Sequence, residues 1–159
     1  MASAKIERRA LTKYPFVIIP VSERSTTAPN GKVVYGTIPP HIAIHLGVPE
    51  GEIRLLNGFE NSSNTGFGLA HISAKEQRKK TISGLGFVSI EQMVYRACSA
   101  YDSIHQGNDG RQLLVKSHGA LGSRQVMLEV VIEWDKAKGF WHVITAFPTA
   151  VVRKPKIWP

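Results

Sequence analysis

The chain has little cysteine, no long apolar run and few acidic residues, and the first two shortages exclude an internal disulfide and a membrane-spanning segment. Cys98 is the only cysteine among 159 residues, so an internal disulfide cannot form and a cysteine-based zinc site is excluded. No apolar run approaches the roughly 20 residues that cross a bilayer. The first residues, Met1 to Lys5, contain no hydrophobic signal-peptide core. We therefore expect no membrane contact and a cytoplasmic site of action, reached after synthesis there or after delivery by secretion or by a phage.

Aspartate and glutamate number 12 against 20 lysines and arginines, which gives a formal net charge of +8. This imbalance indicates an anionic partner, such as a nucleic acid or an acidic protein. The 43% of hydrophobic residues is typical of an ordinary folded domain. We expect a single domain over residues 1–159, with an N-terminal hairpin and helix part at 1–60 and a functional core at 61–150.

The first part of the chain predicts a hairpin followed by a short helix. Phe16–Val21 reads as a strand, and Asn30-Gly31 is a turn signal before a second strand at 33–38. Two prolines then open a helix at His41–Leu46, which Gly47 ends. His41 and His45 have a spacing that can bind metal, but no third ligand stands at a helpful offset, so we expect no metal and no cofactor.

The second part predicts a core helix and an antiparallel meander. Ser89 and Gln92 form a capping-box pattern, and apolar residues recur from there at helical spacing, so a core helix is expected at about 89–104. Three strand-like runs follow at 113–117, 125–134 and 140–147. In the middle run Glu129 and Glu133 alternate away from the apolar side chains and are expected to face solvent. The pattern predicts an α+β domain whose helices cover one sheet face.

One stretch, Gly68 to Lys80, has the clearest chemical character. If it is one helix, Leu69 and Ile72 share one side while His71, Lys75 and Arg78 share another at spacings of i, i+4 and i+7. A histidine flanked by cations suits an anionic substrate, because Lys and Arg hold phosphates and a histidine moves protons. The alternative is a solvated basic face with a packed histidine.

The meander adds a second group of polar residues at the strand ends. Cations, a histidine and hydroxyls are expected to gather at one end of the sheet, because one antiparallel strand ends where the next begins. These residues are Lys116, Ser117, His118, Arg124, Thr145 and Thr149. Ribonucleases that work without metal need an acid, a base and fixed donors for a phosphorane, and these residue types supply all three.

Residues 34–147 also resemble the phage-associated or contact-dependent toxin branch of the barnase–EndoU–colicin–RelE-like ribonuclease superfamily. The likeness is carried by Gly68-Leu69-Ala70-His71-Ile72, by the long amphipathic helix, and by the strand Trp141 to Pro148. It implies an N-terminal hairpin and helices packed on a four-stranded antiparallel sheet. It also implies cleavage of RNA, often tRNA, through attack of the 2′-hydroxyl to give a 2′,3′-cyclic phosphate, and an acidic cognate immunity protein as partner.

The resemblance assigns roles to particular residues. His71 matches the helix histidine and Thr145 the hydroxyl of the last strand, while Lys116 or Arg124 is the central-strand cation. Relatives often carry a second histidine where this chain has Lys75, so either Lys75 or His118 is the second proton carrier. The residues expected to contact the surrounding RNA are Arg78, Lys79, Ser117, His118 and Thr149. The alternative function is a basic module that binds nucleic acid or protein without chemistry.

Overall fold

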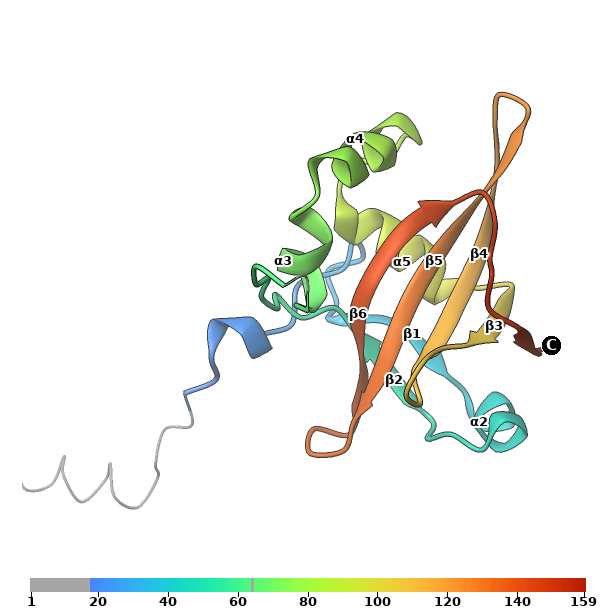
Figure 1. Cartoon of the computed structure of the whole chain (residues 1–159). Helices are drawn as coiled ribbons and strands as arrows, with labels where there is room; N and C mark the ends of the chain where they lie inside the picture. The colour runs from blue at the N-terminus through green and yellow to red at the C-terminus, as the bar shows by residue number, and fades with distance from the viewer. Residues whose placement is uncertain (1–17, 64) are drawn as a thin grey trace, which may run out of the picture.

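A sheet of seven strands organises the molecule. The computed structural model describes residues 18–63 and 65–159. The strand order is β1-β2-β6-β5-β4-β3-β7, with β2 and β6 parallel and the other described neighbours antiparallel. The strands are β1 (Val34–Ile38), β2 (Gly51–Arg54), β3 (Ser103–Gln106), β4 (Gln112–Leu121), β5 (Arg124–Asp135), β6 (Phe140–Thr149) and β7 (Lys156–Trp158). The predicted four-stranded antiparallel sheet is therefore wrong: the sheet is mixed, larger and curled (Figure 1).

The predicted N-terminal hairpin is also wrong. Phe16 and Val17 lie outside the described residues, Ile18 is 83% exposed, and Val21–Glu23 forms a 3-10 helix. β1 pairs instead with β2, because α2 (Pro40–Leu46) and the turn after it bring the chain back alongside. Since β2 also pairs with β6, the first and last parts of the chain share one sheet.

Two predicted helices are confirmed. α2 begins with a proline at its first position and ends at Gly47, whose φ of 68° is a left-handed conformation that favours glycine. α5 (Ile90–Ser99) is capped by the Ser89 hydroxyl, which accepts a hydrogen bond from the Gln92 N–H at 3.1 Å. It ends earlier than expected because the chain turns there and forms β3, which pairs with β4.

The apolar stripe of α5 packs against the sheet to form the core. Met93, Val94, Ala97 and Cys98 are each at most 1% exposed. They face apolar residues of β4 and β5 in one cluster. Burial of each large apolar side chain stabilises the fold by roughly 1.5–3 kcal/mol.

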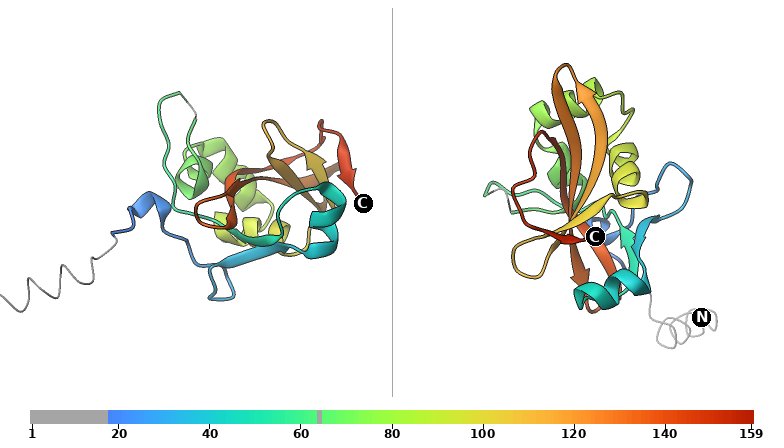
Figure 2. Two further views of the ribbon diagram at one scale, coloured as in Figure 1. Left: turned by 90° about the horizontal axis from the view of Figure 1, so that it is seen from below. Right: turned by 90° about the vertical axis from the view of Figure 1, so that its right-hand side faces the viewer.

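The opposite face of the sheet is framed by two projecting segments (Figure 2). On one side lie loop residues 57–63 and 65–67 and then α3 (Gly68–Ser73) and α4 (Glu76–Gly84), both of which contact β6. On the other side the chain after β6 bows away from the sheet before it reaches β7. These segments position the candidate site.

Candidate functional site

The strand register decides which side chains share the face opposite α5. Leu128, Val130 and Ile132 belong to the core cluster. The alternate residues of β5 therefore point to the other face. Within β5 and β6, Glu129 lies opposite Phe147 and Val131 lies opposite Thr145. Directly opposite residues point the same way, so Thr145 and Glu129 share one face as diagonal neighbours, roughly 7–8 Å apart at Cα.

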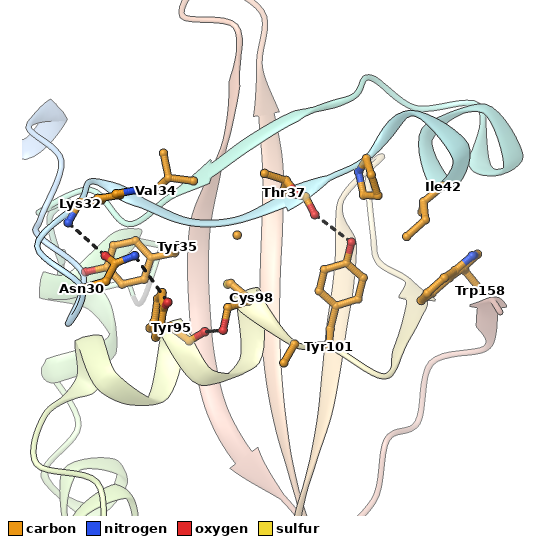
Figure 3. Close-up of a pocket in the computed structure, with 14 residues that line it drawn as sticks. Asn30, Lys32, Val34, Tyr35, Thr37, Ile42, Tyr95, Cys98, Tyr101 and Trp158 are labelled. Carbon is orange, nitrogen blue, oxygen red and sulfur yellow. Dashed lines mark hydrogen bonds between the residues drawn. The ribbon is translucent and has the colours of Figure 1, made fainter.

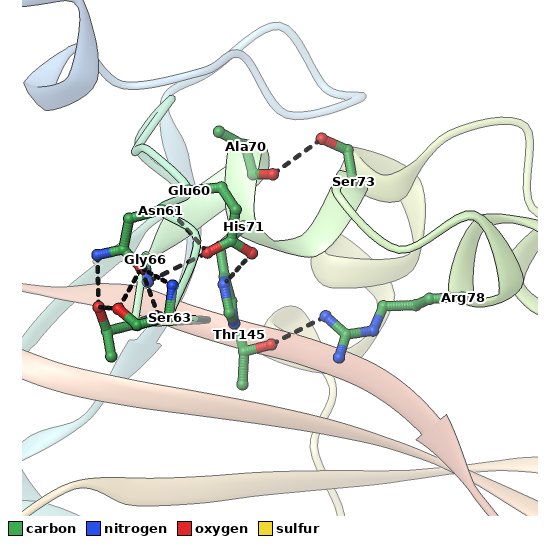
Figure 4. A network of polar contacts seen from close by, with 10 residues as sticks. Glu60, Asn61, Ser63, Gly66, Ala70, His71, Ser73, Arg78 and Thr145 are labelled. Atoms are coloured by element: carbon green, nitrogen blue, oxygen red, sulfur yellow. Dashed lines mark hydrogen bonds and ion pairs between the residues drawn. The ribbon is translucent and has the colours of Figure 1, made fainter.

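His71 reaches this region from α3. The helix begins at Gly68, whose φ is +74° and where a Cβ atom would lie 2.6 Å from the Leu56 carbonyl oxygen, so glycine is required there. The His71 residue is 7% exposed, and its Nδ1 lies 2.9 Å from Glu60 Oε2. Figure 4 shows the imidazole pointing from α3 towards Thr145.

Glu60 is anchored by the loop that carries it. Its Oε1 accepts hydrogen bonds from the Asn61 N–H at 3.0 Å and the Gly66 N–H at 3.4 Å, which leaves Oε2 for His71. Loss of hydration acts to raise the pKa of Glu60, but these N–H groups and His71 outweigh it, and the pKa is lowered. The ionised carboxylate accepts the proton of His71 Nδ1, so Nε2 is the acceptor whenever the imidazole is neutral. Such an imidazole is oriented to act as a general base.

Arg78 and Thr145 form the second half of the cluster. Arg78 Nη1 donates a hydrogen bond to Thr145 Oγ1 at 3.2 Å, and its guanidinium carbon lies 5.6 Å from the centre of the Phe147 ring. Burial lowers the pKa of Arg78, while Glu60 acts to raise it. A guanidinium remains charged in proteins, so this group supplies a fixed cation beside the imidazole.

Glu129 is an unexpected member of this face. The sequence predicts a solvent-facing carboxylate, but the residue is 8% exposed. Burial raises the pKa of Glu129, and the charges of His105 and Lys154 act to lower it. A carboxyl group whose neutral form is favoured can donate a proton.

The structure brings together three predicted residues: His71, Arg78 and Thr145 (Figure 4). The other predicted cations lie elsewhere. Lys75 is exposed at the start of α4. Lys116 pairs with Asp102 at 3.2 Å.

Arg124 lies at the far end of β5. It is opposite Leu121, seven residues from Val131, which is the residue opposite Thr145. At a strand rise of about 3.3 Å per residue this is roughly 23 Å. The expectation that Thr145 and Arg124 share one end of the sheet is wrong, because Thr145 lies nearer the middle of β6.

The remaining predicted RNA contacts have local partners. Lys79 pairs with Glu76 at 2.7 Å. The His118 ring stacks on Phe87 at 4.7 Å, and its Nε2 donates to the Leu85 carbonyl at 3.3 Å. The Ser117 N–H donates to Asp102, and the Thr149 hydroxyl to the Val151 carbonyl. None of these groups touches His71 or Thr145 among the described contacts.

The expectation of one continuous helix over 68–80 is wrong. Lys75 has φ −99° and ψ 110°, an extended conformation that separates α3 from α4. His71 and Arg78 therefore reach the cluster from two helices. Lys75 is removed from the face that a single helix would have given it.

Sequence reasoning missed Glu60 as a site residue. It is a lone carboxylate in a loop rich in Asn, Ser and Gly, shortly before the histidine helix. A single acidic residue in an otherwise neutral loop is the only signal in the sequence, because a loop has no periodic pattern from which the direction of a side chain could be predicted. Glu129 could have been suspected from its position within a strongly apolar strand.

A separate hollow of about 620 Å³ lies between β1 and the end of α5 (Figure 3). Tyr101 crosses it and donates a hydrogen bond to the Thr37 carbonyl at 2.8 Å. The predicted site residues do not line it. Among residues 18–63 and 65–159, no three His, Cys, Asp or Glu side chains gather closely enough to hold a metal ion.

Comparisons with known proteins leave the site to be interpreted from its own geometry. No family model, curated protein or solved structure matches this chain. In the described part of the chain, no helix combines the length and apolar character needed to cross a membrane.

Proposed function

We propose that this protein is a metal-independent endoribonuclease of the toxin type, with RNA, and tRNA in particular, as its substrate. The observation that supports this most is the Glu60–His71 pair beside the Arg78–Thr145 pair on a sheet face. An oriented imidazole, a fixed guanidinium and a hydroxyl are the groups that transfer of a phosphoryl group to a 2′-hydroxyl requires. The net charge of +8 favours a polyanionic substrate.

In the proposed reaction His71 Nε2 accepts the proton of the 2′-hydroxyl, and the freed oxygen attacks phosphorus. The bond from phosphorus to the 5′-oxygen breaks, which leaves a 2′,3′-cyclic phosphate. Arg78 stabilises the negative charge of the phosphorane, and the Thr145 hydroxyl orients the phosphate. Glu129 donates a proton to the departing 5′-oxygen, a role favoured by its raised pKa.

Incubation of the purified protein with total tRNA in EDTA tests this proposal. We expect fragments that end in a 2′,3′-cyclic phosphate, and we expect His71→Ala to lose this activity and to relieve growth arrest on expression. His45→Ala is the matched control, because His45 is an exposed histidine on α2, outside the candidate site. Cleavage that EDTA abolishes would refute the metal-independent mechanism.

A second candidate function is binding of nucleic acid or protein without chemistry. The low exposure of His71 favours it, because a buried, hydrogen-bonded histidine also serves as a structural link between a loop and a helix. This function predicts salt-sensitive binding from which intact RNA is recovered. As part of the toxin proposal we also expect an acidic immunity protein, because charge complementarity speeds association with a basic partner.

A further inference from the structure

The segment that follows β6 carries three cations and no acid. Residues 150–159 include Arg153, Lys154 and Lys156, and all three side chains are exposed. Within the described part of the chain, none of them lies within ion-pair distance of a carboxylate. Lys154 Nζ instead donates to the neutral Asn108 side chain at 2.8 Å.

The structure holds this segment in place at both ends. At its start the Thr149 hydroxyl closes a turn with Val151. At its end β7 pairs with β3, and His105 Nδ1 donates to the Lys154 carbonyl oxygen at 2.7 Å. The Gln106 N–H donates to the Pro155 carbonyl oxygen at 2.9 Å. The cations are therefore presented from an anchored arch.

The arch lies on the same side of the sheet as the candidate site. Figure 2 shows it projecting to the side opposite α5, as the loop that carries Glu60 also does. Between the two lie β6, β5 and β4, and Glu129 on this face feels the charges of His105 and Lys154. From β6 to β3 there are three strand spacings, which is roughly 14 Å.

We infer that residues 150–156 form a second wall, on the same side of the sheet as the candidate site, which binds phosphates of a single RNA strand away from the phosphate that is cut. This inference rests on the proposed function. The separation from Thr145 is too large for the arch to touch the scissile phosphate, so its cations act on binding of longer RNA. A dinucleotide, which has one internal phosphate, is too short to reach both walls.

The test compares Arg153→Ala/Lys156→Ala with Lys32→Ala/Lys136→Ala, which removes the same charge from exposed positions outside this segment. The binding probe is a single-stranded oligoribonucleotide of roughly 12 nucleotides, a length within the range that small domains cover, with 2′-methoxy groups that prevent cleavage. We expect the first variant to bind about 2- to 30-fold more weakly. The slope of the logarithm of its binding constant against the logarithm of salt concentration should become shallower by about 0.7 for each lost phosphate contact. Its cleavage of a dinucleotide should equal that of the wild type.

Equal weakening in the two double variants would overturn the inference, because net charge alone would then explain the effect. Unchanged binding in the arch variant would overturn it as well. A wild-type protein that binds the probe, loses affinity in the arch variant only, and cuts no RNA would refute the endoribonuclease proposal while supporting the second wall. The two proposals therefore fail in different ways.

Discussion

Replacing Glu60 by glutamine tests the central feature of the proposed site. The glutamine oxygen can still accept from the Asn61 and Gly66 N–H groups, which leaves its NH₂ group facing His71. That NH₂ group is a donor, so the imidazole must present an unprotonated Nδ1 and carry its proton on Nε2. Nε2 then cannot accept a proton from a 2′-hydroxyl.

The structure sets the size of the expected effect. The change replaces a hydrogen bond to a charged group by a neutral one, a difference of about 1–1.5 kcal/mol that corresponds to about a 5- to 13-fold fall in rate. Enforcement of the wrong tautomer adds to this, up to about 10⁴-fold in enzymes that depend on an oriented histidine. We expect the loss in kcat more than in KM, because the tautomer affects the proton transfer and leaves RNA binding intact.

Single-turnover cleavage of tRNA in EDTA measures this effect. Glu76→Gln is the matched control, because Glu76 is an exposed residue of α4 that pairs with Lys79 and does not contact His71 among the described residues. Thermal unfolding confirms that both variants are folded. If Glu60→Gln cleaves as fast as Glu76→Gln, then Glu60 does not orient a catalytic base and the mechanism is refuted.

Three further predictions concern the site and its support. Thr145→Val keeps the shape of the side chain but removes the hydroxyl that binds the α4 guanidinium, so cleavage should slow while the thermal midpoint stays close to that of the wild type. Glu129→Gln should raise the thermal midpoint at pH 7 and slow cleavage. Because the pKa of Glu129 is raised in the folded protein, this carboxyl stabilises the fold at pH values below its ordinary pKa of 4.5, and the stabilisation is lost as pH rises through the folded pKa. Glutamine does not ionise and therefore avoids that loss. An unchanged midpoint across pH 4–8 would contradict this. Gly36→Ala should destabilise by about 1–3 kcal/mol or more in urea unfolding, because its Cβ would lie 2.0 Å from the Cys98 carbonyl oxygen, whereas Gly84→Ala, with nothing within 4 Å, should be neutral or stabilising.

The parts of the fold that could be predicted are those with long patterns. α5 combines a cap with four buried apolar residues at helical spacing, and β5 has Val126, Leu128, Val130 and Ile132 at every second position. α2 is marked at both ends by proline and glycine. In each case several local signals favour the same structure, so the element does not depend on contacts with distant parts of the chain to be predicted.

The parts that could not be predicted are short or depend on distant partners. β7 has three residues and β3 has four, which is too few for a period to be recognised. The parallel pairing of β2 with β6 joins residues about ninety positions apart, which no local pattern encodes. Of the strand expected at 16–21, the described residues 18–21 pair with no strand of the described chain, because apolar composition alone does not make a strand.

In the candidate site, residue chemistry predicted more than residue spacing did. His71, Arg78 and Thr145 could be selected because an imidazole, a guanidinium and a hydroxyl suit a phosphodiester. The helix that was to align them is broken at Lys75, and the contact from Arg78 to Thr145 depends on how α4 sits against β6. Glu60 could not be placed, since only the folded loop brings it to the histidine.

The charge balance of the cluster has a consequence for substrate binding. Among the described side chains that face one another there, Glu60 is ionised and Arg78 is cationic, so the two nearly cancel. A neutral Glu129 leaves that balance unchanged, whereas an ionised one would repel a phosphate. Affinity for a polyanion would then come from cations outside the cluster, because the cluster contributes little net attraction. In the proposed function the exposed arginine and lysines of residues 150–156 supply it, and the groups proposed to bind RNA are then separate from those proposed to transfer protons.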